Sequence, residues 1–144
     1  MKKILIIHGP NLNLLGAREP ETYGHRTLAD INAALSDRGD ALGLEIETFQ
    51  SNHEGAIVDK IQAATDCAGL IINPAAYTHT SIAIRDALLS LDIPIVEVHL
   101  SNIYKREPFR HQSMIADVVT GKIVGLGGDG YLLALEAVER MISG

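Results

Sequence analysis

Tryptophan is absent from the 144-residue sequence, and Cys67 is its one cysteine. A single cysteine cannot form a disulfide within the chain. Its apolar surroundings at residues 63–69 favour a buried, inert thiol over a reactive one. No apolar run approaches the ~20 residues of a membrane-spanning helix, and the run at residues 4–7 is too short for a signal peptide. These absences predict a cytoplasmic protein with no membrane partner.

An excess of positive charge is also missing. The formal net charge is -6 at pH 7, which argues against nucleic acid as a partner. The six histidines show no metal-ligand spacing such as H-E-x-x-H, so we expect no metal site. The content of 47% hydrophobic and 21% charged residues is ordinary for a globular protein. The length predicts one domain over residues 1–144.

Short apolar runs alternate with helical patterns along the chain. We expect strands at Ile4–Ile7, Leu44–Phe49, Gly69–Asn73, Pro94–His99 and Lys122–Val124. We expect helices from Leu28, capped by Thr27, to about Leu42 with Gly43 at its end, and then over Glu54–Ala64, Thr80–Leu91 and Tyr131–Ile142. The alternation predicts an α/β fold with a five-stranded parallel sheet and helices on both faces, the second strand lying nearer an edge.

Polar residues follow the first, third and fourth of these strands. The first is followed by a loop up to Gly24, which is long for a connection that typically has about two to six residues. The third leads into residues 73–81 and the fourth into residues 99–110, which include Arg106 and Arg110. Because ligands bind beyond the carboxyl ends of parallel strands, these segments predict one site for an anionic, hydroxylated small molecule.

Each of these segments also has a purely structural interpretation. Residues 9–11 could form only a turn, Tyr23 could be an aromatic plug, and residues 78–81 are good helix caps. We interpret Arg106 as a surface charge. His99 could be a satisfied buried histidine, although Glu97 lies two residues before it on the same face of a strand. A neighbouring carboxylate fixes the tautomer of a histidine and favours its charged form.

One glycine-rich segment satisfies a nucleotide-binding pattern that its position excludes. Residues 125–130 match G-x-G-x-x-G, but only 14 residues follow them, too few for the acidic ribose contact and the next strand. We expect a tight turn and close helix packing there instead. The first loop has no Gly-Lys-Ser/Thr, so it is not a nucleotide P-loop.

A family resemblance covers nearly the whole chain. It rests on four segments: GPNLNLLGAREPETYG, NPAAYTHTS, HLSNIYKREPFRHQS and GKIVGLGGDGYLLAL. In order and spacing they resemble the type II 3-dehydroquinate dehydratases. The resemblance implies a flavodoxin-like three-layer fold and a homododecamer made of four trimers. It also implies dehydration of 3-dehydroquinate to 3-dehydroshikimate, without metal or cofactor, in the shikimate or quinate pathway. The unrelated type I enzymes use a Schiff-base lysine, whereas Lys105 is the only lysine we expect near the site.

The resemblance also implies a role for each catalytic residue. Tyr23 is the base that removes a proton beside the ketone, and Arg18 keeps it ionisable. His99 is the acid that protonates the departing hydroxyl, Glu97 orients His99, and Asn11 helps hold a water at the enolate. A tyrosine starts near a pKa of about 10, and a guanidinium nearby can lower the pKa of an acid by roughly one to three units. The long first loop would thus carry the base and its activator.

The remaining site residues are implied to bind the substrate. They are Asn73, Leu100 and Ser101 for the carboxylate and a nearby hydroxyl, His79 and Arg110 for ring hydroxyls, and Asp86, which would reach into a neighbouring subunit's site. Two alternatives stay open. One is a flavodoxin-like module that binds FMN or phosphate, and the other is a scaffold subunit without activity.

Overall fold

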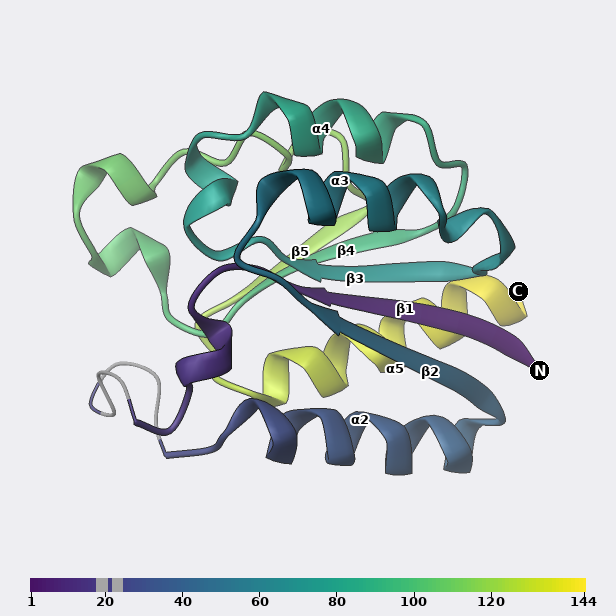
Figure 1. Cartoon of the computed structure of the whole chain (residues 1–144). Helices are drawn as coiled ribbons and strands as arrows, with labels where there is room; N and C mark the ends of the chain where they lie inside the picture. Colours follow the sequence, from purple (N-terminus) through teal and green to yellow (C-terminus); the bar gives the residue numbers. More distant parts are fainter. Residues whose placement is uncertain (18–20, 22–24) are drawn as a thin grey trace.

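Five parallel strands form the centre of the computed structural model, which describes residues 1–17, 21 and 25–144. The predicted catalytic residues Arg18 and Tyr23 lie outside the described residues. The strands are β1 (Lys2–His8), β2 (Leu44–Gln50), β3 (Gly69–Asn73), β4 (Ile95–His99) and β5 (Gly121–Val124), in the order β2-β1-β3-β4-β5 (Figure 1). This is the flavodoxin-like order, and it confirms both the predicted fold and the edge position of the second strand.

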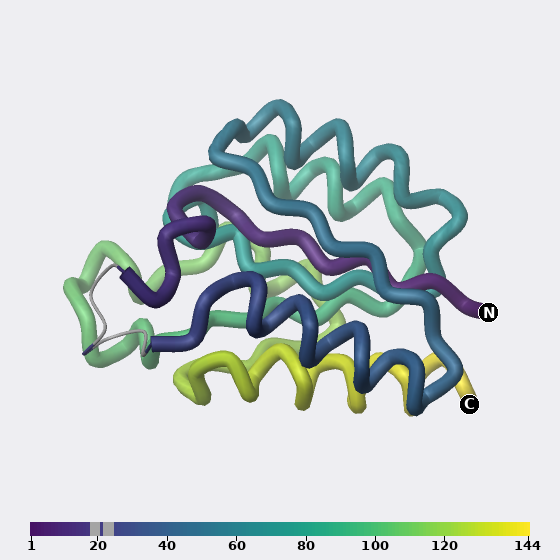
Figure 2. The backbone as a smooth tube through the Cα atoms, turned by 60° about the horizontal axis from the view of Figure 1, so that its bottom comes forward, coloured from purple at the N-terminus to yellow at the C-terminus, as the bar shows by residue number. Residues whose placement is uncertain are grey.

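Helices cover both faces of the sheet. They are α2 (Leu28–Leu42), α3 (Glu54–Gln62), α4 (Ile82–Leu89) and α5 (Asp129–Ser143). Figures 1 and 2 show α2 and α5 side by side on one face and α3 and α4 on the other. Two apolar cores result, one beneath each helix pair. On β1, Ile4 and Ile6 enter the first core, while Leu5 and Ile7 enter the second, because successive side chains on a strand alternate.

The helix boundaries follow from the caps. The Thr27 side chain accepts a hydrogen bond from the Asp30 N–H, and Gly43 ends α2 with a left-handed φ of 73°, as predicted. The helix predicted from Thr80 begins instead at Ile82, because the Ser81 hydroxyl caps it by accepting from the Ile84 N–H. The predicted helices over Glu54–Ala64 and Thr80–Leu91 end two residues early, and the last begins at Asp129 rather than Tyr131.

Short 3-10 helices follow the strands at the carboxyl edge of the sheet, and no pattern in the sequence predicted them. They are η1 (Leu12–Leu14), η3 (Ala75–His79), η4 (Ile103–Lys105) and η5 (Pro108–Arg110); a fifth, η2 (Ala64–Asp66), precedes β3. These turns place the polar residues of three connections around one edge. Within the described part of the chain, no helix is both long and apolar enough to span a bilayer.

Candidate active site

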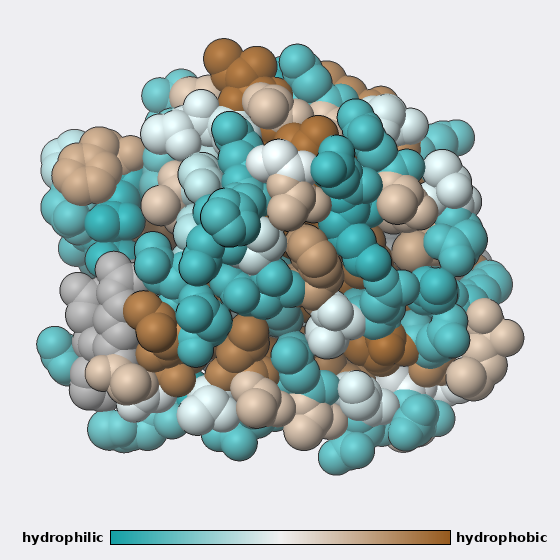
Figure 3. Space-filling model, viewed as in Figure 1, coloured by the Kyte–Doolittle hydropathy of each residue, from teal (hydrophilic) through white to brown (hydrophobic). Residues whose placement is uncertain are grey.

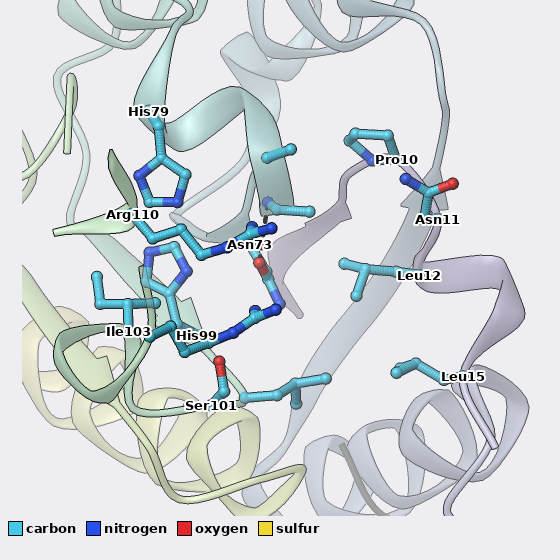
Figure 4. A pocket seen from close by; sticks show the side chains of 14 residues that line it. Pro10, Asn11, Leu12, Leu15, Asn73, His79, His99, Ser101, Ile103 and Arg110 are labelled. Atoms are coloured by element: carbon cyan, nitrogen blue, oxygen red, sulfur yellow. Dashed lines mark hydrogen bonds between the residues drawn. The ribbon is translucent and has the colours of Figure 1, made fainter. Parts of the chain in front are cut away.

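A pocket opens at the carboxyl edge of the sheet, where the predicted segments meet. Figure 4 shows Pro10, Asn11, Leu12 and Leu15 on one side, with His79, His99 and Arg110 on the other. The predicted site residues that line it are Asn11, Asn73, His79, His99, Leu100, Ser101 and Arg110. The rest of the lining comes from Pro10, Leu12, Leu15, Ala75, Ala76, Ile103 and Arg106. The expected convergence of the three connections on one site is therefore confirmed.

The segments after β1 and β3 meet at unusually close range. The Gly9 N–H donates to the Asn73 carbonyl at 2.8 Å, and a β-carbon on Gly9 would lie 2.3 Å from the Pro74 carbonyl oxygen. Asn11 and Ala75 are the non-glycine residues with positive φ among the described residues, at 68° and 54°. Both line the pocket, and such strained backbone clusters at functional sites. Besides turning the chain, residues 9–11 thus bring Pro10 and Asn11 into the pocket lining.

His79 presents a hydrogen-bond acceptor to the pocket. Its Nδ1 donates to the Gln112 carbonyl at 2.8 Å, which leaves Nε2 available on the other side of the ring. Burial lowers the pKa of His79, and the charges of His99 and Arg110 lower it further. A neutral His79 can therefore accept a hydrogen bond from a ligand hydroxyl through Nε2. The ring also stacks on His99, with centroids 6.5 Å apart.

His99, which lines the pocket, forms a buried pair with Glu97 behind it. The His99 Nε2 lies 2.5 Å from the Glu97 Oε2, and the carboxylate side chain is fully buried while His99 is 5% exposed. Because the carboxylate holds Nε2–H, Nδ1 is the ring nitrogen free to exchange a proton with a ligand. The predicted same-face placement of the two side chains is confirmed, and Glu97 lies behind His99 rather than in the pocket lining.

Two further residues hold the buried Glu97 carboxylate. The Ser113 hydroxyl donates to it at 3.1 Å, and the Lys122 ammonium lies 3.7 Å from Oε2. Lys122 faces Glu97 directly across the β4–β5 ladder, and its side chain is 17% exposed. The expectation that Lys105 is the only lysine near the site is therefore wrong. A buried carboxylate needs such partners, because removing it from water without them is costly.

The two arginines of the fourth connection give the pocket positive charge. Arg110 pairs with Glu107 at 3.1 Å, and Arg106 lies 3.8 Å from the same carboxylate. The Arg106 side chain is 19% exposed and lines the pocket, so its interpretation as a surface charge is wrong. The sequence carried no signal that separates Arg106 from an ordinary surface arginine, because its placement depends on two successive 3-10 turns.

The glycine-rich turn between β5 and α5 supports the end of β4. The Gly125 N–H donates to the His99 carbonyl at 3.1 Å, and the Gly127 N–H donates to the Leu100 carbonyl at 2.9 Å. Both glycines have positive φ, while a β-carbon on Gly130 would touch Val98 and Ile123 at 3.4 Å. The predicted tight turn and close packing are confirmed. Here the backbone N–H groups that a dinucleotide-binding loop would direct at a phosphate hold the end of β4 instead, at His99 and Leu100.

Asp86 lies away from this pocket. It is exposed on α4, on the opposite side from the buried Ile84 and Leu88. Among the residues that the structure describes, no three or more His, Cys, Asp or Glu side chains form a group suited to a metal ion. Cys67 is buried, and burial raises the pKa of its thiol to about 11, which fits the inert thiol predicted for it.

Fold and pocket together define a flavodoxin-like α/β enzyme built for a small, anionic, hydroxylated molecule. Its wall offers two guanidinium groups, a neutral histidine and a histidine backed by a buried carboxylate. Acid–base chemistry on such a ligand is what this set of groups can perform.

Comparison with known proteins specifies the family. Residues 2–139 match the model of the family described as dehydroquinase class II. The chain is 63% identical over 143 residues to "3-dehydroquinate dehydratase 1" of Ralstonia nicotianae, covering 98% of this chain and 92% of that protein. It is 59% identical to "Catabolic 3-dehydroquinase 1" of Aspergillus terreus, covering 95% and 91%. The crystal structure of a type II dehydroquinase from Butyrivibrio crossotus superposes with a TM-score of 0.93 at 46% identity, covering 99% and 98%. The chain belongs to the type II 3-dehydroquinate dehydratases, which are lyases.

Proposed function

We propose that this chain dehydrates 3-dehydroquinate to 3-dehydroshikimate through an enolate, with Tyr23 as the base and His99 as the general acid. Tyr23 takes a proton from the carbon beside the ketone, and the C–H electron pair moves into the enolate. The enolate then expels the β-hydroxyl, which leaves as water after receiving a proton from His99. Arg18 favours the ionised form of Tyr23, and Asn11 helps hold a water that stabilises the enolate oxygen.

The observation that carries this function is the buried Glu97–His99 pair opening into a cationic pocket. The pair supplies a proton donor whose orientation is fixed by a carboxylate that cannot reach solvent. Family membership favours it over an FMN- or phosphate-binding module and over an inactive scaffold. The dehydration places the chain in the shikimate pathway or in quinate breakdown.

The pocket lining suits the functional groups of 3-dehydroquinate. Asn73, with the Leu100–Ser101 segment, binds the carboxylate and the neighbouring hydroxyl. His79 accepts from a ring hydroxyl through its free Nε2, and Arg110 donates to another. Arg106 on the same wall adds attraction for the carboxylate, because opposite charges within a low-dielectric pocket interact strongly.

We also propose that the enzyme works in the cytoplasm as a homododecamer of four trimers, in which Asp86 serves a neighbouring subunit's site. On α4, Asp86 shares one outward stripe with Ile82 and Leu89, which are 62% and 59% exposed and lie four residues before and three after it. Apolar side chains also come to the surface over α4 at the top of Figure 3. An acidic residue between exposed apolar ones fits a contact between copies.

Adding 3-dehydroquinate and following the ultraviolet absorbance of the conjugated enone tests the reaction. We expect absorbance to rise at the same rate with and without a chelator. Tyr23→Phe keeps the ring but removes the base, so it should abolish the rise. An unchanged rate in this variant would place the base elsewhere, and a rise abolished by the chelator would contradict a metal-free reaction.

A further inference from the structure

A second buried histidine, His8, ends β1 directly beside Asn73 at the end of β3. The two residues are register partners in neighbouring strands, so their side chains leave the sheet on the same face. His8 is fully buried and does not line the pocket, whereas Asn73 does. The proposed reaction gives His8 no role.

His8 is linked to the pocket residue Asn73 through one intermediary, Tyr131 of α5. The His8 Nδ1 lies 2.8 Å from the Tyr131 hydroxyl, and its Nε2 lies 2.8 Å from the Asn32 Oδ1 of α2. The fully buried Tyr131 hydroxyl in turn lies close enough to the Asn73 side chain for that amide to lower the pKa of the phenol. The Asn73 Oδ1 accepts from the Ala75 N–H at 3.0 Å.

The direction of every hydrogen in this network follows from its end at Asn32. An amide oxygen only accepts, so His8 carries its proton on Nε2. Burial lowers the pKa of His8 to about 4, so the ring is neutral and its Nδ1 has no proton at neutral pH. Nδ1 must then accept from the Tyr131 hydroxyl, which leaves the Tyr131 oxygen as an acceptor for the Asn73 N–H. With the hydrogens reversed, the unprotonated Nε2 of His8 would face the Asn32 oxygen, which is also an acceptor. The Tyr131 hydroxyl would then point its hydrogen at Asn73, and the Asn73 N–H would have no acceptor there.

The Asn73 amide carries this order of donors and acceptors to the pocket, because it has an acceptor oxygen on one side and a donor nitrogen on the other. Its oxygen accepts from the Ala75 N–H, and the Tyr131 oxygen is the acceptor beside its two N–H groups. The second N–H of that amide is left for the pocket that Asn73 lines. We propose that His8 and Tyr131 are positioning residues that fix this orientation, so that Asn73 offers a donor and selects a carboxylate; this rests on the proposed role of Asn73 in binding the substrate.

Two binding probes test the selectivity. Quinate, the alcohol that corresponds to 3-dehydroquinate, and its carboxamide are compared as competitive inhibitors. Wild type should prefer quinate, because the carboxamide loses the charge that the Asn73 N–H recognises. Tyr131→Phe removes the acceptor of Asn73, and His8→Leu removes the acceptor of Tyr131. Each change leaves the Asn73 amide held through the Ala75 N–H alone, so its oxygen can turn to the pocket more often and the preference should fall about tenfold. Tyr77→Phe is the matched control, because its hydroxyl donates to the Asn52 carbonyl and it does not line the pocket.

The outcomes separate the relay from the assignment of Asn73. If Asn73→Ala lowers the preference while Tyr131→Phe and His8→Leu keep it, Asn73 binds the carboxylate but the relay is wrong. If Asn73→Ala also keeps the preference, the substrate contact itself is wrong. Equal weakening of both inhibitors in the Tyr131 and His8 variants would indicate a merely structural role and overturn the relay.

A measurement on the unchanged protein covers the case in which a variant fails to fold. Nitrogen-15 NMR of the imidazole distinguishes the two neutral tautomers directly. We expect His8 to carry its proton on Nε2 throughout the neutral range. A proton on Nδ1 would reverse the network and refute the relay, whatever the activity of the enzyme.

Discussion

Two histidines end two strands of the same sheet, and their partners give them opposite chemistry. His8 and His99 are both buried, at 0% and 5% exposure. His8 is hydrogen-bonded to neutral groups, a phenol and an amide, and burial keeps it uncharged. His99 contacts a carboxylate and borders the pocket. The residue type at the end of a strand therefore does not identify a catalyst; the charge of its partner and its access to ligand do.

Of the two histidines, His99 is the proposed general acid, and removing it should have the largest effect. We expect His99→Ala to lower turnover by about 10²- to 10⁴-fold, because a positioned general acid contributes that much. If Tyr23 is the base, this variant should still exchange the substrate hydrogen beside the ketone in deuterated water, and faster than it dehydrates. NMR of the substrate measures both rates. Strong exchange by Tyr23→Phe would contradict the assignment of the base.

Removing His8 should also change how the stability of the fold depends on pH. A pKa lowered from 6.5 to about 4 means that the unfolded chain binds the proton more tightly, so stability falls as the pH drops from 6.5 toward 4. That loss amounts to about 3 kcal/mol of unfolding free energy. Urea unfolding at pH 7 and pH 4 should show the loss in wild type, and His8→Leu should be less sensitive by about this amount. As a control, replacing the exposed His53 by Gln should leave the sensitivity of wild type unchanged.

Changing Glu97, the partner of His99, tests whether the negative charge of that partner matters for turnover. Glu97→Gln keeps the shape and a hydrogen-bonding oxygen but removes the negative charge. We expect turnover to fall about 10- to 100-fold, the cost of a hydrogen bond to a charged group. Glu97→Asp keeps the charge on a shorter side chain and should retain more activity. Equal losses of turnover in both variants, measured by the enone assay, would show that Glu97 acts through the geometry of its side chain and not through its charge.

The smallest effect is expected at Lys122, which contacts Glu97 and lies further from the pocket than Glu97 does. Lys122→Met removes a positive charge 3.7 Å from the Glu97 carboxylate, so the Glu97–His99 pair should bind protons more tightly. The pH–rate profile should therefore move toward higher pH, with turnover at pH 7 changed only a few-fold. Lys122→Arg should preserve the profile, and Lys105→Met is the matched control. An unmoved profile would reduce Lys122 to a packing role.

Local patterns in the sequence predicted the features that depend on neighbouring residues of one segment. The alternation of apolar runs predicted the sheet, Thr27 and Gly43 predicted the ends of α2, and the two-residue spacing of Glu97 and His99 predicted their pairing. Asn11 and Asn73 were placed at the site because they follow strands.

The errors and omissions concern contacts between elements that are distant in the sequence. Lys122 reaches Glu97 only because β5 pairs with β4 in one register, and Arg106 enters the pocket only through the 3-10 turns around it. His8 lies at a strand end like any other, and its partners Asn32 and Tyr131 come from helices whose packing has no signature in the sequence. Periodicity and spacing describe one segment at a time, so such contacts leave no local signal.

The close approach of Gly9 to Pro74 has a consequence for changing the substrate range of this enzyme. No side chain fits at residue 9, and the Gly9–Asn73 hydrogen bond joins the first and third connections into one rigid unit. The opposite wall, at residues 103–110, consists of two short 3-10 turns without strand pairing. Directed evolution toward altered ring substituents should therefore succeed with libraries over that wall, while libraries at Gly9 should yield mostly misfolded protein.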